Sequence, residues 1–429
     1  MEMESLLKCM NCGHTTSILQ ERLFRCPKCS GLYDVQHNIP KRTPQNWMEL
    51  FDSRPHSAQE PSGVWRFKEW IMPFLPKEDI VTLGEGIVPI VPIGANLKLW
   101  LGKPCDAWLI MEGKSPTNSF KDFGMTVLVS VAKAAGIKTL VCASTGDTSA
   151  SLAAYTGKAG IKCAVILPSG KITPEQILQA KILGATVITL PGSFDDCMQV
   201  LQNLVSDYGA YPGNSLNPAR IEGHQSTVFL TAQFFGWKFP DWFVNPVGNG
   251  SDCSSIGKAL RLMKSIGFKA ESRILGSQSE AANPLFTSWQ KSGGIKTTRE
   301  KWETFYNPTH VGETIATAMR IGNPVSYLKV IREIIASNGG MTQVSDQEAR
   351  EAVLACALDG HFVCPQSGVA LAGLKRALND RIIKPRERVV VVSTADGLKF
   401  TKPFQHCSEE NIINAPDCHT KTIAEILNL

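Results

Sequence analysis

One lysine stands in a hydroxyl-rich loop that opens directly into an apolar helix. The loop runs from Ser115 to Gly124 with the sequence SPTNSFKDFG, and the lysine is Lys121. An amine at the mouth of a helix, partly removed from water, loses its proton more readily than a solvated amine and can attack an aldehyde to form a Schiff base. Lys121 is therefore the candidate catalytic residue. Position alone also allows a solvated lysine in a first helical turn.

Two further turns have residue types suited to a phosphorylated aromatic cofactor. The apolar run Thr139 to Ala143 leads into a turn from Ser144 to Ser151 that is dense in small hydroxyl residues and could floor a flat ring. The apolar run Phe243 to Val247 leads into a glycine-rich turn, formed by Gly248, Asn249, Gly250, Ser251 and Asp252. Backbone N–H groups at such a turn, with a helix N-terminus behind it, bind anions such as phosphate. A Gly-x-Gly sequence alone is more often a tight turn, but the three segments together favour a cofactor site.

These segments resemble those of the pyridoxal-phosphate enzymes of the tryptophan-synthase-β type (fold type II), and within them the plant-type branch of the threonine synthases. Further matching stretches follow in family order, so that the resemblance covers nearly the whole chain. They are Asp34 to His37, Leu50 to Arg54, Gly113 to Ser130, Asn214 to Gly223, Cys364 to Ala370 and Val391 to Thr401.

The resemblance implies a role for each candidate residue. Lys121 would hold pyridoxal 5'-phosphate and later take the substrate's Cα proton. Asp147 would face the cofactor's phenolic oxygen, the turn from Gly248 to Asp252 its phosphate, and Thr394 its pyridine nitrogen. The implied substrate-binding residues are Ser119, Ser144, Thr145, Thr148, Asn214 and Arg220, with Lys114 and Lys399 as weaker candidates.

Several of these residue types have chemical consequences, and each also has an ordinary alternative. The neutral hydroxyl of Thr394 cannot stabilise a protonated pyridine as a carboxylate would, which favours elimination; otherwise Thr394 is a plain strand-end threonine. Asp147 beside an anionic oxygen requires a shared proton, or it caps the following helix. Arg220 can bind two phosphate oxygens at once, or it is a surface helix residue paired with Glu222.

Two residues depart from the family's pattern. Asn118 stands where glycine is usual, and asparagine tolerates the left-handed backbone that glycine adopts, so the loop can be kept. Asp396 stands where histidine is usual, which puts an anion near the ring nitrogen in place of a possible cation.

The resemblance implies the conversion of O-phospho-L-homoserine and water to L-threonine and phosphate, by γ-elimination and β-addition of water. The departing phosphate, held by Arg220 and Asn214, would assist the attack of water. One alternative is a related lyase, such as a threonine dehydratase or a phospho-amino-acid lyase. Another is a docking module carried on an inactive enzyme body.

Four cysteines form two C-x-x-C knuckles near the start of the chain, Cys9 with Cys12 and Cys26 with Cys29. Paired knuckles match tetrahedral thiolate ligation and predict a zinc ribbon, whose closed site would be structural. The alternative is a ribbon that keeps its cysteines but is only partly metallated.

Composition narrows the class of protein. The chain has 429 residues, 43% of them hydrophobic, which is enough for a substantial core in two or three domains. Its formal net charge of +5 is small for this length, and the sequence contains no run of basic residues, which argues against nucleic acid as a partner. We expect no leader and no membrane span, a cytoplasmic location with the 13 cysteines reduced, and a homodimer acting on a small molecule.

Alternating strands and helices must position the candidate residues. Apolar strands at Cys163 to Leu167 and Thr186 to Leu190 alternate with helices at Pro174 to Leu183 and Asp195 to Tyr208. A second run has strands at Trp242 to Val247, Arg273 to Gly276 and Arg388 to Val392, a helix from about Ser254 to Ile266 and a short tail helix at Thr422 to Leu427.

Such alternation predicts an α/β fold with two facing parallel units and the cofactor between them, at the carboxyl ends of the strands. The expected organisation is a zinc-ribbon-like module at 1–35, a first part of the large domain at 36–117, a small α/β domain at 118–215, the remainder of the large domain at 216–405 and a C-terminal tail at 406–429.

Overall fold

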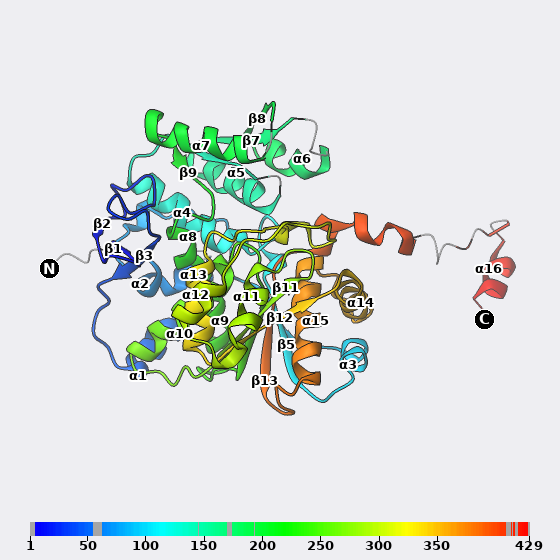
Figure 1. The fold of residues 1–429 in the computed structure, drawn as a ribbon. Coiled ribbons are helices and arrows are strands. Elements are labelled where there is room, and N and C mark those ends of the chain that lie inside the picture. The colour runs from blue at the N-terminus through cyan, green and yellow to red at the C-terminus, as the bar shows by residue number, and fades with distance from the viewer. Residues whose placement is uncertain are drawn as a thin grey trace.

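The computed structural model describes residues 5–54, 62–144, 146–169, 174–192, 194–408, 413, 415–416 and 419–427. The strands of these residues form three sheets (Figure 1). The N-terminal sheet is antiparallel, with the order β2-β1-β3. Its strands are β1 (Ser5–Cys9), β2 (Thr15–Ser17) and β3 (Tyr33–His37).

The largest sheet has six strands in the order β12-β11-β10-β13-β5-β4. The strands are β4 (Ile90–Pro92), β5 (Asp106–Met111), β10 (Trp242–Pro246), β11 (Arg273–Ser279), β12 (Gly340–Val344) and β13 (Arg388–Ser393). All neighbours pair in parallel except β4, which runs antiparallel to β5 at the edge. The central strands β10 and β13 are buried almost throughout, as expected for parallel strands covered on both faces.

The third sheet is parallel and has the order β8-β7-β6-β9. Its strands are β6 (Thr139–Cys142), β7 (Lys162–Pro168), β8 (Thr186–Leu190) and β9 (Tyr211–Pro212). The helices α5 (Asp147–Ala159), α6 (Pro174–Ile182) and α7 (Phe194–Tyr208) connect successive strands, and Figure 1 shows them together at the top of the molecule. The strands and helices expected in this region match these elements to within one residue at each end.

Helices cover both faces of the six-stranded sheet. On one face lie α3 (Ala95–Leu101), α14 (Asp346–Leu358) and α15 (Pro365–Asn379), and the opposite face carries α9 (Ser226–Phe234), α10 (Ser251–Ser265) and α13 (Tyr327–Ala336) (Figure 1). The remaining α-helices are α1 (Pro44–Asp52), α2 (Lys68–Ile71), α4 (Lys121–Ala134), α8 (Ala219–His224), α11 (Pro284–Ser292), α12 (Arg299–Phe305) and α16 (Thr420–Ile426). The expected fold class, two parallel α/β units preceded by a small ribbon-like module, is confirmed.

The sequence analysis misplaced or missed some elements. Helix α10 begins at Ser251, not near Ser254, because Gly250 takes a left-handed conformation (φ 86°) that ends the turn and lets the helix start at the next residue. Strands β4, β5, β9 and β12 were not expected, and β11 continues to Ser279, beyond the expected end at Gly276. The tail helix α16 begins two residues before the expected Thr422.

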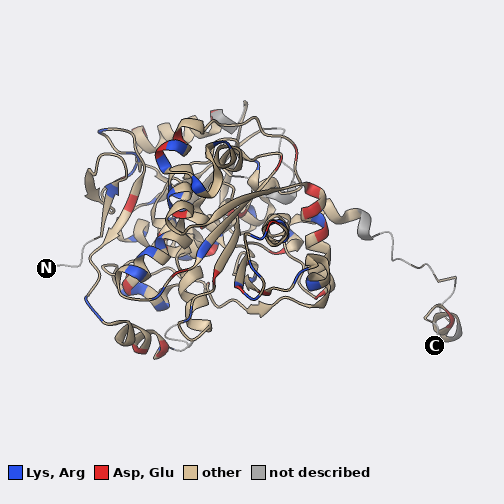
Figure 2. Cartoon of the chain, turned by 60° about the horizontal axis from the view of Figure 1, so that its bottom comes forward, with Lys and Arg blue, Asp and Glu red and all other residues tan. Residues whose placement is uncertain are grey.

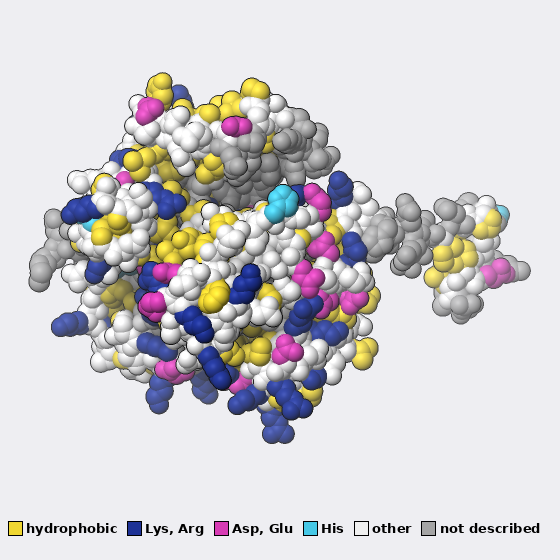
Figure 3. Space-filling model, in the orientation of Figure 1, with side chains coloured by type: hydrophobic (Ala, Val, Ile, Leu, Met, Phe, Trp, Pro, Cys, Tyr) yellow, Lys and Arg dark blue, Asp and Glu magenta, His cyan; other side chains and the backbone are white. Residues whose placement is uncertain are grey.

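Charged side chains are mixed over the surface that the structure describes. Figures 2 and 3 show lysine and arginine interspersed with aspartate and glutamate, in keeping with the small net charge of +5. Among the described helices, none combines the length and the apolar character that crossing a membrane requires.

Candidate active site

The loop before Lys121 is fixed to the end of β13. The backbone N–H of Phe120 donates to the carbonyl of Thr394 (2.8 Å), and the N–H of Asp396 donates to the carbonyl of Asn118 (3.1 Å). Asn118 has φ 61°, so it adopts the left-handed conformation for which glycine is usual. Lys121 is thereby placed as the first residue of α4, beside the carboxyl end of the central strand β13.

Lys121 has an environment that favours its neutral amine. Its Nζ lies 3.5 Å from the centroid of the Phe120 ring, and the side chain is partly buried. Burial and the positive charge of Arg220 lower the pKa of Lys121 to about 7, against the opposing charges of Asp147 and Asp252. This environment differs from that of the solvated lysine considered as the alternative.

Thr394 lies among neutral groups. Its Oγ1 is 3.4 Å from Cys364 Sγ and 3.5 Å from Ser367 Oγ, and its N–H donates to Ser367 Oγ (2.9 Å). Burial raises the pKa of the Cys364 thiol, which keeps it protonated. Hydroxyl and thiol groups at this position can form a hydrogen bond with the unprotonated nitrogen of a pyridine ring. They carry no negative charge and so cannot neutralise a protonated pyridine nitrogen.

The hydroxyl-rich turn is held by Asn214. The Asn214 amide donates to the carbonyl of Ala143 (3.0 Å) and accepts from the Ala143 N–H (3.1 Å), directly before Ser144. Ser144 and Thr148 are partly exposed, and Thr145 lies outside the described residues. In the Lys121 loop, Ser119 is fully buried, and its Oγ has no hydrogen-bond partner among the residues described.

Two lysine–aspartate pairs link the loop regions. Lys399 Nζ contacts Asp147 Oδ1 (2.8 Å) and donates to the carbonyl of Thr117 (2.9 Å), and Lys114 Nζ contacts Asp396 Oδ2 (2.7 Å). The anion that Asp396 introduces is therefore neutralised. Asp147 is the first residue of α5 and not its cap, because the cap position belongs to Gly146, without a side-chain cap bond.

Arg220 is fully buried and only partly paired. Its Nη1 donates to the carbonyl of Gly213 (3.2 Å), while Nε and Nη2 meet no partner in the described part of the chain. Glu222 instead contacts His37 and Lys258, so the surface pairing considered for Arg220 is wrong. A buried guanidinium with free donors is costly unless an anion binds there, and its planar fork suits a phosphate.

The glycine-rich turn forms a tight cradle at the start of α10. A Cβ on Gly250 would lie 2.4 Å from Val330 Cγ2, so a side chain there would displace a neighbour. Asn249 Oδ1 accepts from the Val325 N–H (3.2 Å). Ser251 and Asp252 fall in the first helical turn, and both are buried.

Two buried ionisable residues near this site were missed by the sequence analysis. Glu112 directly follows β5, and its Oε1 accepts from Thr227 Oγ1 (2.5 Å). His224 lies one helical turn after Arg220, with its ring centroid 5.0 Å from that of Phe120; neither ring nitrogen has a partner among described residues. Glu112 could have been found from the sequence because it directly follows an apolar strand, as Ser144 and Thr394 follow theirs.

The four ribbon cysteines come together. Sγ of Cys9 lies 3.4 Å from that of Cys29, Sγ of Cys12 lies 3.5 Å from that of Cys26, and all four sulfurs lie within 4.8 Å of one another. Zn–S bonds of about 2.3 Å in a tetrahedron require sulfurs about 3.8 Å apart, so this donor set fits a zinc ion.

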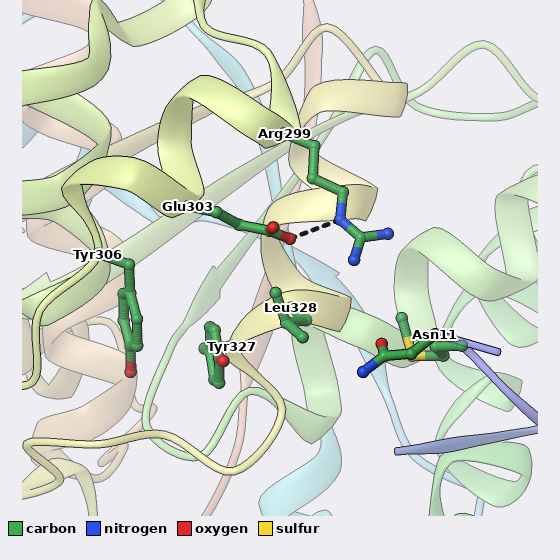
Figure 4. Close-up of a pocket in the computed structure, with 7 residues that line it drawn as sticks. Asn11, Arg299, Glu303, Tyr306, Tyr327 and Leu328 are labelled. Atoms are coloured by element: carbon green, nitrogen blue, oxygen red, sulfur yellow. Dashed lines mark hydrogen bonds and ion pairs between the residues drawn. The ribbon is translucent and has the colours of Figure 1, made fainter. Parts of the chain in front are cut away.

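A separate cavity of about 510 Å³ opens beside the ribbon, lined by Met10, Asn11, Arg299, Glu303, Tyr306, Tyr327 and Leu328. Figure 4 shows the Arg299–Glu303 ion pair (2.7 Å) above the two tyrosines. The tyrosine rings stack with centroids 4.2 Å apart. None of these lining residues was predicted to take part in the chemistry.

The residues around Lys121 fit pyridoxal 5'-phosphate. They offer an amine with a lowered pKa, neutral groups around Thr394, and a glycine cradle at a helix N-terminus. Unpaired buried polar atoms surround them, a pattern typical of a site that receives a polar ligand; within the described chain these include atoms of Glu112, Ser119, Arg220, His224 and Asp252.

Comparison with known proteins supports a site for pyridoxal 5'-phosphate in this chain. The family described as pyridoxal-phosphate dependent enzyme matches residues 81–395. Threonine synthase of Methanocaldococcus jannaschii is 36% identical over 426 residues, covering 98% of this chain and 99% of that protein. Chloroplastic threonine synthase 2 of Arabidopsis thaliana is 35% identical over 419 residues, covering 95% of this chain and 77% of that protein.

Solved structures share the fold. Threonine synthase from Escherichia coli superimposes with a TM-score of 0.70 at 20% identity, covering 98% of this chain and 94% of that one. Processed threonine deaminase isoform 2 from Solanum lycopersicum gives a TM-score of 0.63 at 16% identity, covering 87% and 96%. At these identities the likeness concerns the fold alone.

Proposed function

Because the chain belongs to the family of pyridoxal-phosphate dependent enzymes, we propose that it acts as a threonine synthase, converting O-phospho-L-homoserine and water to L-threonine and phosphate. The observation that carries this proposal is a likeness to threonine synthases over nearly the full chain, combined with a buried, partly unpaired arginine close enough to lower the pKa of Lys121. A substrate phosphate is an anion suited to that arginine.

The cofactor, when bound, supplies an electron sink that makes hydrogens on the substrate's Cα acidic. Lys121 would hold its aldehyde carbon, the turn from Gly248 to Asp252 its phosphate, Thr394 its ring nitrogen and Asp147 its phenolic oxygen. Lys399, already paired with Asp147, would offset the negative charge on that side of the ring.

Lys121 would carry the proton transfers. With a pKa lowered to about 7, its amine is largely neutral at and above neutral pH and can accept the Cα proton. A base whose pKa lies near the working pH can both take and return a proton, which this reaction requires at more than one carbon. The fixed loop from Ser115 to Phe120 keeps the amine in place.

Arg220 would hold the substrate phosphate before and after it leaves Cγ. Asn214, which fixes the turn at Ser144, would orient the hydroxyls of Ser144, Thr145 and Thr148 toward the substrate, and Ser119 would offer its unpaired hydroxyl. A phosphate retained on Arg220 can accept a proton from the water that adds at Cβ. This role explains how the active site would supply a base beyond Lys121.

We further propose a structural zinc ion on Cys9, Cys12, Cys26 and Cys29, supported by their converging sulfurs. The reduced state of these thiolates suits the cytoplasm. We also propose a homodimer, and a large domain built from 36–117 and 216–405 around a small domain at 118–215. Metal analysis should find one zinc per chain, and light scattering on the purified protein tests the dimer.

The test of function is product analysis. Purified protein loaded with pyridoxal 5'-phosphate should release equal amounts of L-threonine and phosphate from O-phospho-L-homoserine, and Lys121→Ala should release neither. A 2-oxo acid in place of threonine would instead identify a related lyase. Borohydride reduction followed by digestion should tag the peptide that contains Lys121, and a tag elsewhere would contradict the assignment.

A further inference from the structure

A carboxyl group lies in the cradle proposed for the cofactor's phosphate. Asp252 is the second residue of α10, two positions after Gly250 of the turn, and it is only 4% exposed. Neither carboxylate oxygen has a hydrogen-bond partner in the described part of the chain. An ionised carboxylate here would repel a phosphate dianion across a site with little water to screen the two charges.

The surroundings of Asp252 favour its protonated form. Burial raises the pKa of Asp252 to about 7, opposed chiefly by the positive charge of Lys121. Glu112 is a second buried acid beside it, and burial together with the negative charge of Asp252 raises its pKa well above the usual range. When two carboxyl groups are buried side by side, ionisation of one disfavours ionisation of the other. The pair therefore retains at least one proton near neutral pH.

The other charged groups around α10 are already paired. Those on the elements packed against this helix pair as Lys258 with Glu222, Arg261 with Glu333, Lys264 with Glu271, Arg273 with Glu387, and both Lys329 and Arg332 with Asp34. Arg220 and His224 on α8 face Lys121, and burial, together with the positive charges of Arg220 and Lys121, lowers the pKa of His224 well below its usual value. Among the residues that the structure describes, the groups left to respond to a phosphate at the cradle are therefore Lys121, Glu112 and Asp252.

We propose that the cradle at residues 248–252 binds a phosphate monoester together with one proton from solvent, and that Asp252 is the group that takes the proton up. In its protonated form Asp252 donates a hydrogen bond to a phosphate oxygen, so the same side chain that would repel the dianion becomes a donor. This inference rests on the proposed cofactor, because it concerns the phosphate of pyridoxal 5'-phosphate.

The sign of the pH dependence follows from the free protein. Below pH 7 Asp252 is already protonated and phosphate binding needs no proton from solvent. Above pH 7 Asp252 is ionised before binding, so affinity falls by up to tenfold for each further pH unit. The second ionisation of a phosphate ester lies near pH 6, so measurements between pH 7 and 9 exclude its contribution.

The test uses the full-length protein freed of cofactor and titrated with pyridoxine 5'-phosphate, which has the phosphate but no aldehyde. Because this probe cannot react with Lys121, imine formation does not enter the measurement. Calorimetry at pH 8 in two buffers of different ionisation enthalpy counts the protons taken up. The pyridine nitrogen of the probe also titrates in this pH range, so the count is taken as the difference from pyridoxine, which has the same ring. We expect pyridoxine 5'-phosphate to take up about one proton more than pyridoxine in the wild-type chain and almost no more in Asp252→Asn, which should also bind the phosphate ester at pH 9 more tightly than the wild type.

Two controls test whether the proton uptake is specific to Asp252 and to the phosphate group. Glu300→Gln, at the second residue of α12, removes an exposed acid from a comparable helical position and should leave the proton count unchanged. In the wild-type chain, pyridoxine without its phosphate should take up about one proton fewer than pyridoxine 5'-phosphate, which tests the proposal even if Asp252→Asn fails to fold.

An Asp252→Asn protein in which the phosphate ester still takes up one proton more than pyridoxine would show that Lys121 or Glu112 accepts it, and would overturn the proposal. Equal proton counts for the two ligands in the wild-type chain would overturn it as well. If the wild-type chain does not bind pyridoxine 5'-phosphate at all, the proposed cofactor itself fails, which is a different result.

Discussion

At the scale of single residues, two cations in unlike surroundings define the site. Lys121 is a partly buried amine whose pKa is lowered toward neutrality, and Arg220 is a fully buried guanidinium that burial does not discharge, because its pKa falls only to about 10. The first can exchange protons at neutral pH and the second can only hold an anion. This division of labour matches a reaction that moves protons on carbon while a phosphate departs.

Arg220→Ala should weaken the reaction with O-phospho-L-homoserine strongly, because the variant would lose the buried bidentate partner that we propose for the substrate phosphate. We expect kcat/KM to fall about 100-fold, with a smaller loss for Arg220→Lys, which keeps the charge but not the fork. The inhibition constant of inorganic phosphate should rise in parallel. Arg320→Ala, which breaks the exposed pair with Glu313, is the matched control and should change neither quantity. Full turnover in Arg220→Ala would end the proposed role.

Lys121 should react as an amine at an unusually low pH. In protein freed of cofactor, acylation by a small amine-directed reagent requires the neutral amine, so labelling of Lys121 should rise with a midpoint near pH 7, against about 10.4 for an ordinary lysine. Mass spectrometry of the digested protein measures the label at each lysine, and exposed lysines such as Lys41 give an internal reference. A midpoint above pH 9 would contradict the buried environment described for Lys121.

At the scale of elements, the site is assembled from turns that follow parallel strands. Lys121 lies against the end of β13, Ser144 follows β6 and Gly248 follows β10, so each of the three segments lies at the carboxyl end of a parallel strand. Such turns were recognisable in the sequence because an apolar run followed by glycine or hydroxyl residues marks a strand-to-helix junction. Most of the fold could be predicted for that reason, and so could the positions in it of the three candidate segments.

The remainder depended on contacts that a linear pattern does not contain. Glu112 is held by Thr227, which lies 115 residues away, and no local signal marks that contact. The pairing of Glu222 with His37 spans 185 residues, which is why Glu222 was wrongly considered as a partner of Arg220. Strand β12 mixes Gly, Thr and Gln with apolar residues, and its burial comes from its place beside β11.

The loop before α4 depends on the left-handed backbone of Asn118. The side chain of Asn118 is exposed, while its backbone bonds to Ser115 and Asp396, so we attribute its importance to its conformation. Asn118→Gly should keep stability and activity. Asn118→Val should cost about 1–2 kcal/mol of unfolding free energy and lower kcat, because a β-branched residue resists positive φ. Denaturant unfolding and steady-state kinetics check this, with Thr186→Val on the exposed edge strand β8 as the neutral control. Equal behaviour of the glycine and valine variants would contradict it.

At the scale of the whole molecule, the N-terminal ribbon is bound to the body that holds the site. From β3, His37 contacts Glu222 (2.9 Å), the carbonyl of Val35 accepts from Lys258 (2.7 Å) and the carbonyl of Tyr33 accepts from Lys329 (2.5 Å). These contacts reach helices α8, α10 and α13. Helix α8 carries Arg220, and α10 begins at the turn proposed to bind the cofactor's phosphate, so the ribbon packs against both elements that we propose bind anions.

Glu222 is the centre of this support, since one fully buried carboxylate accepts from His37, Lys258 and Gln225. Glu222→Gln removes the charge but keeps the shape, leaving Lys258 without its ionic partner in a largely buried place. Breaking a buried ion pair by removing one partner costs about 3–5 kcal/mol, so the variant should unfold at a clearly lower denaturant concentration. Because Arg220 lies on the same helix, KM for O-phospho-L-homoserine should rise even where the folded enzyme is fully loaded with cofactor.

Glu303→Gln is the control variant. It breaks the partly exposed pair with Arg299 and should lower the free energy of unfolding by less than about 1 kcal/mol, with KM unchanged. If Glu222→Gln is less stable but has an unchanged KM, the ribbon stabilises the fold without positioning Arg220. If neither the stability nor KM changes, the contact between ribbon and body contributes less to stability than its burial implies.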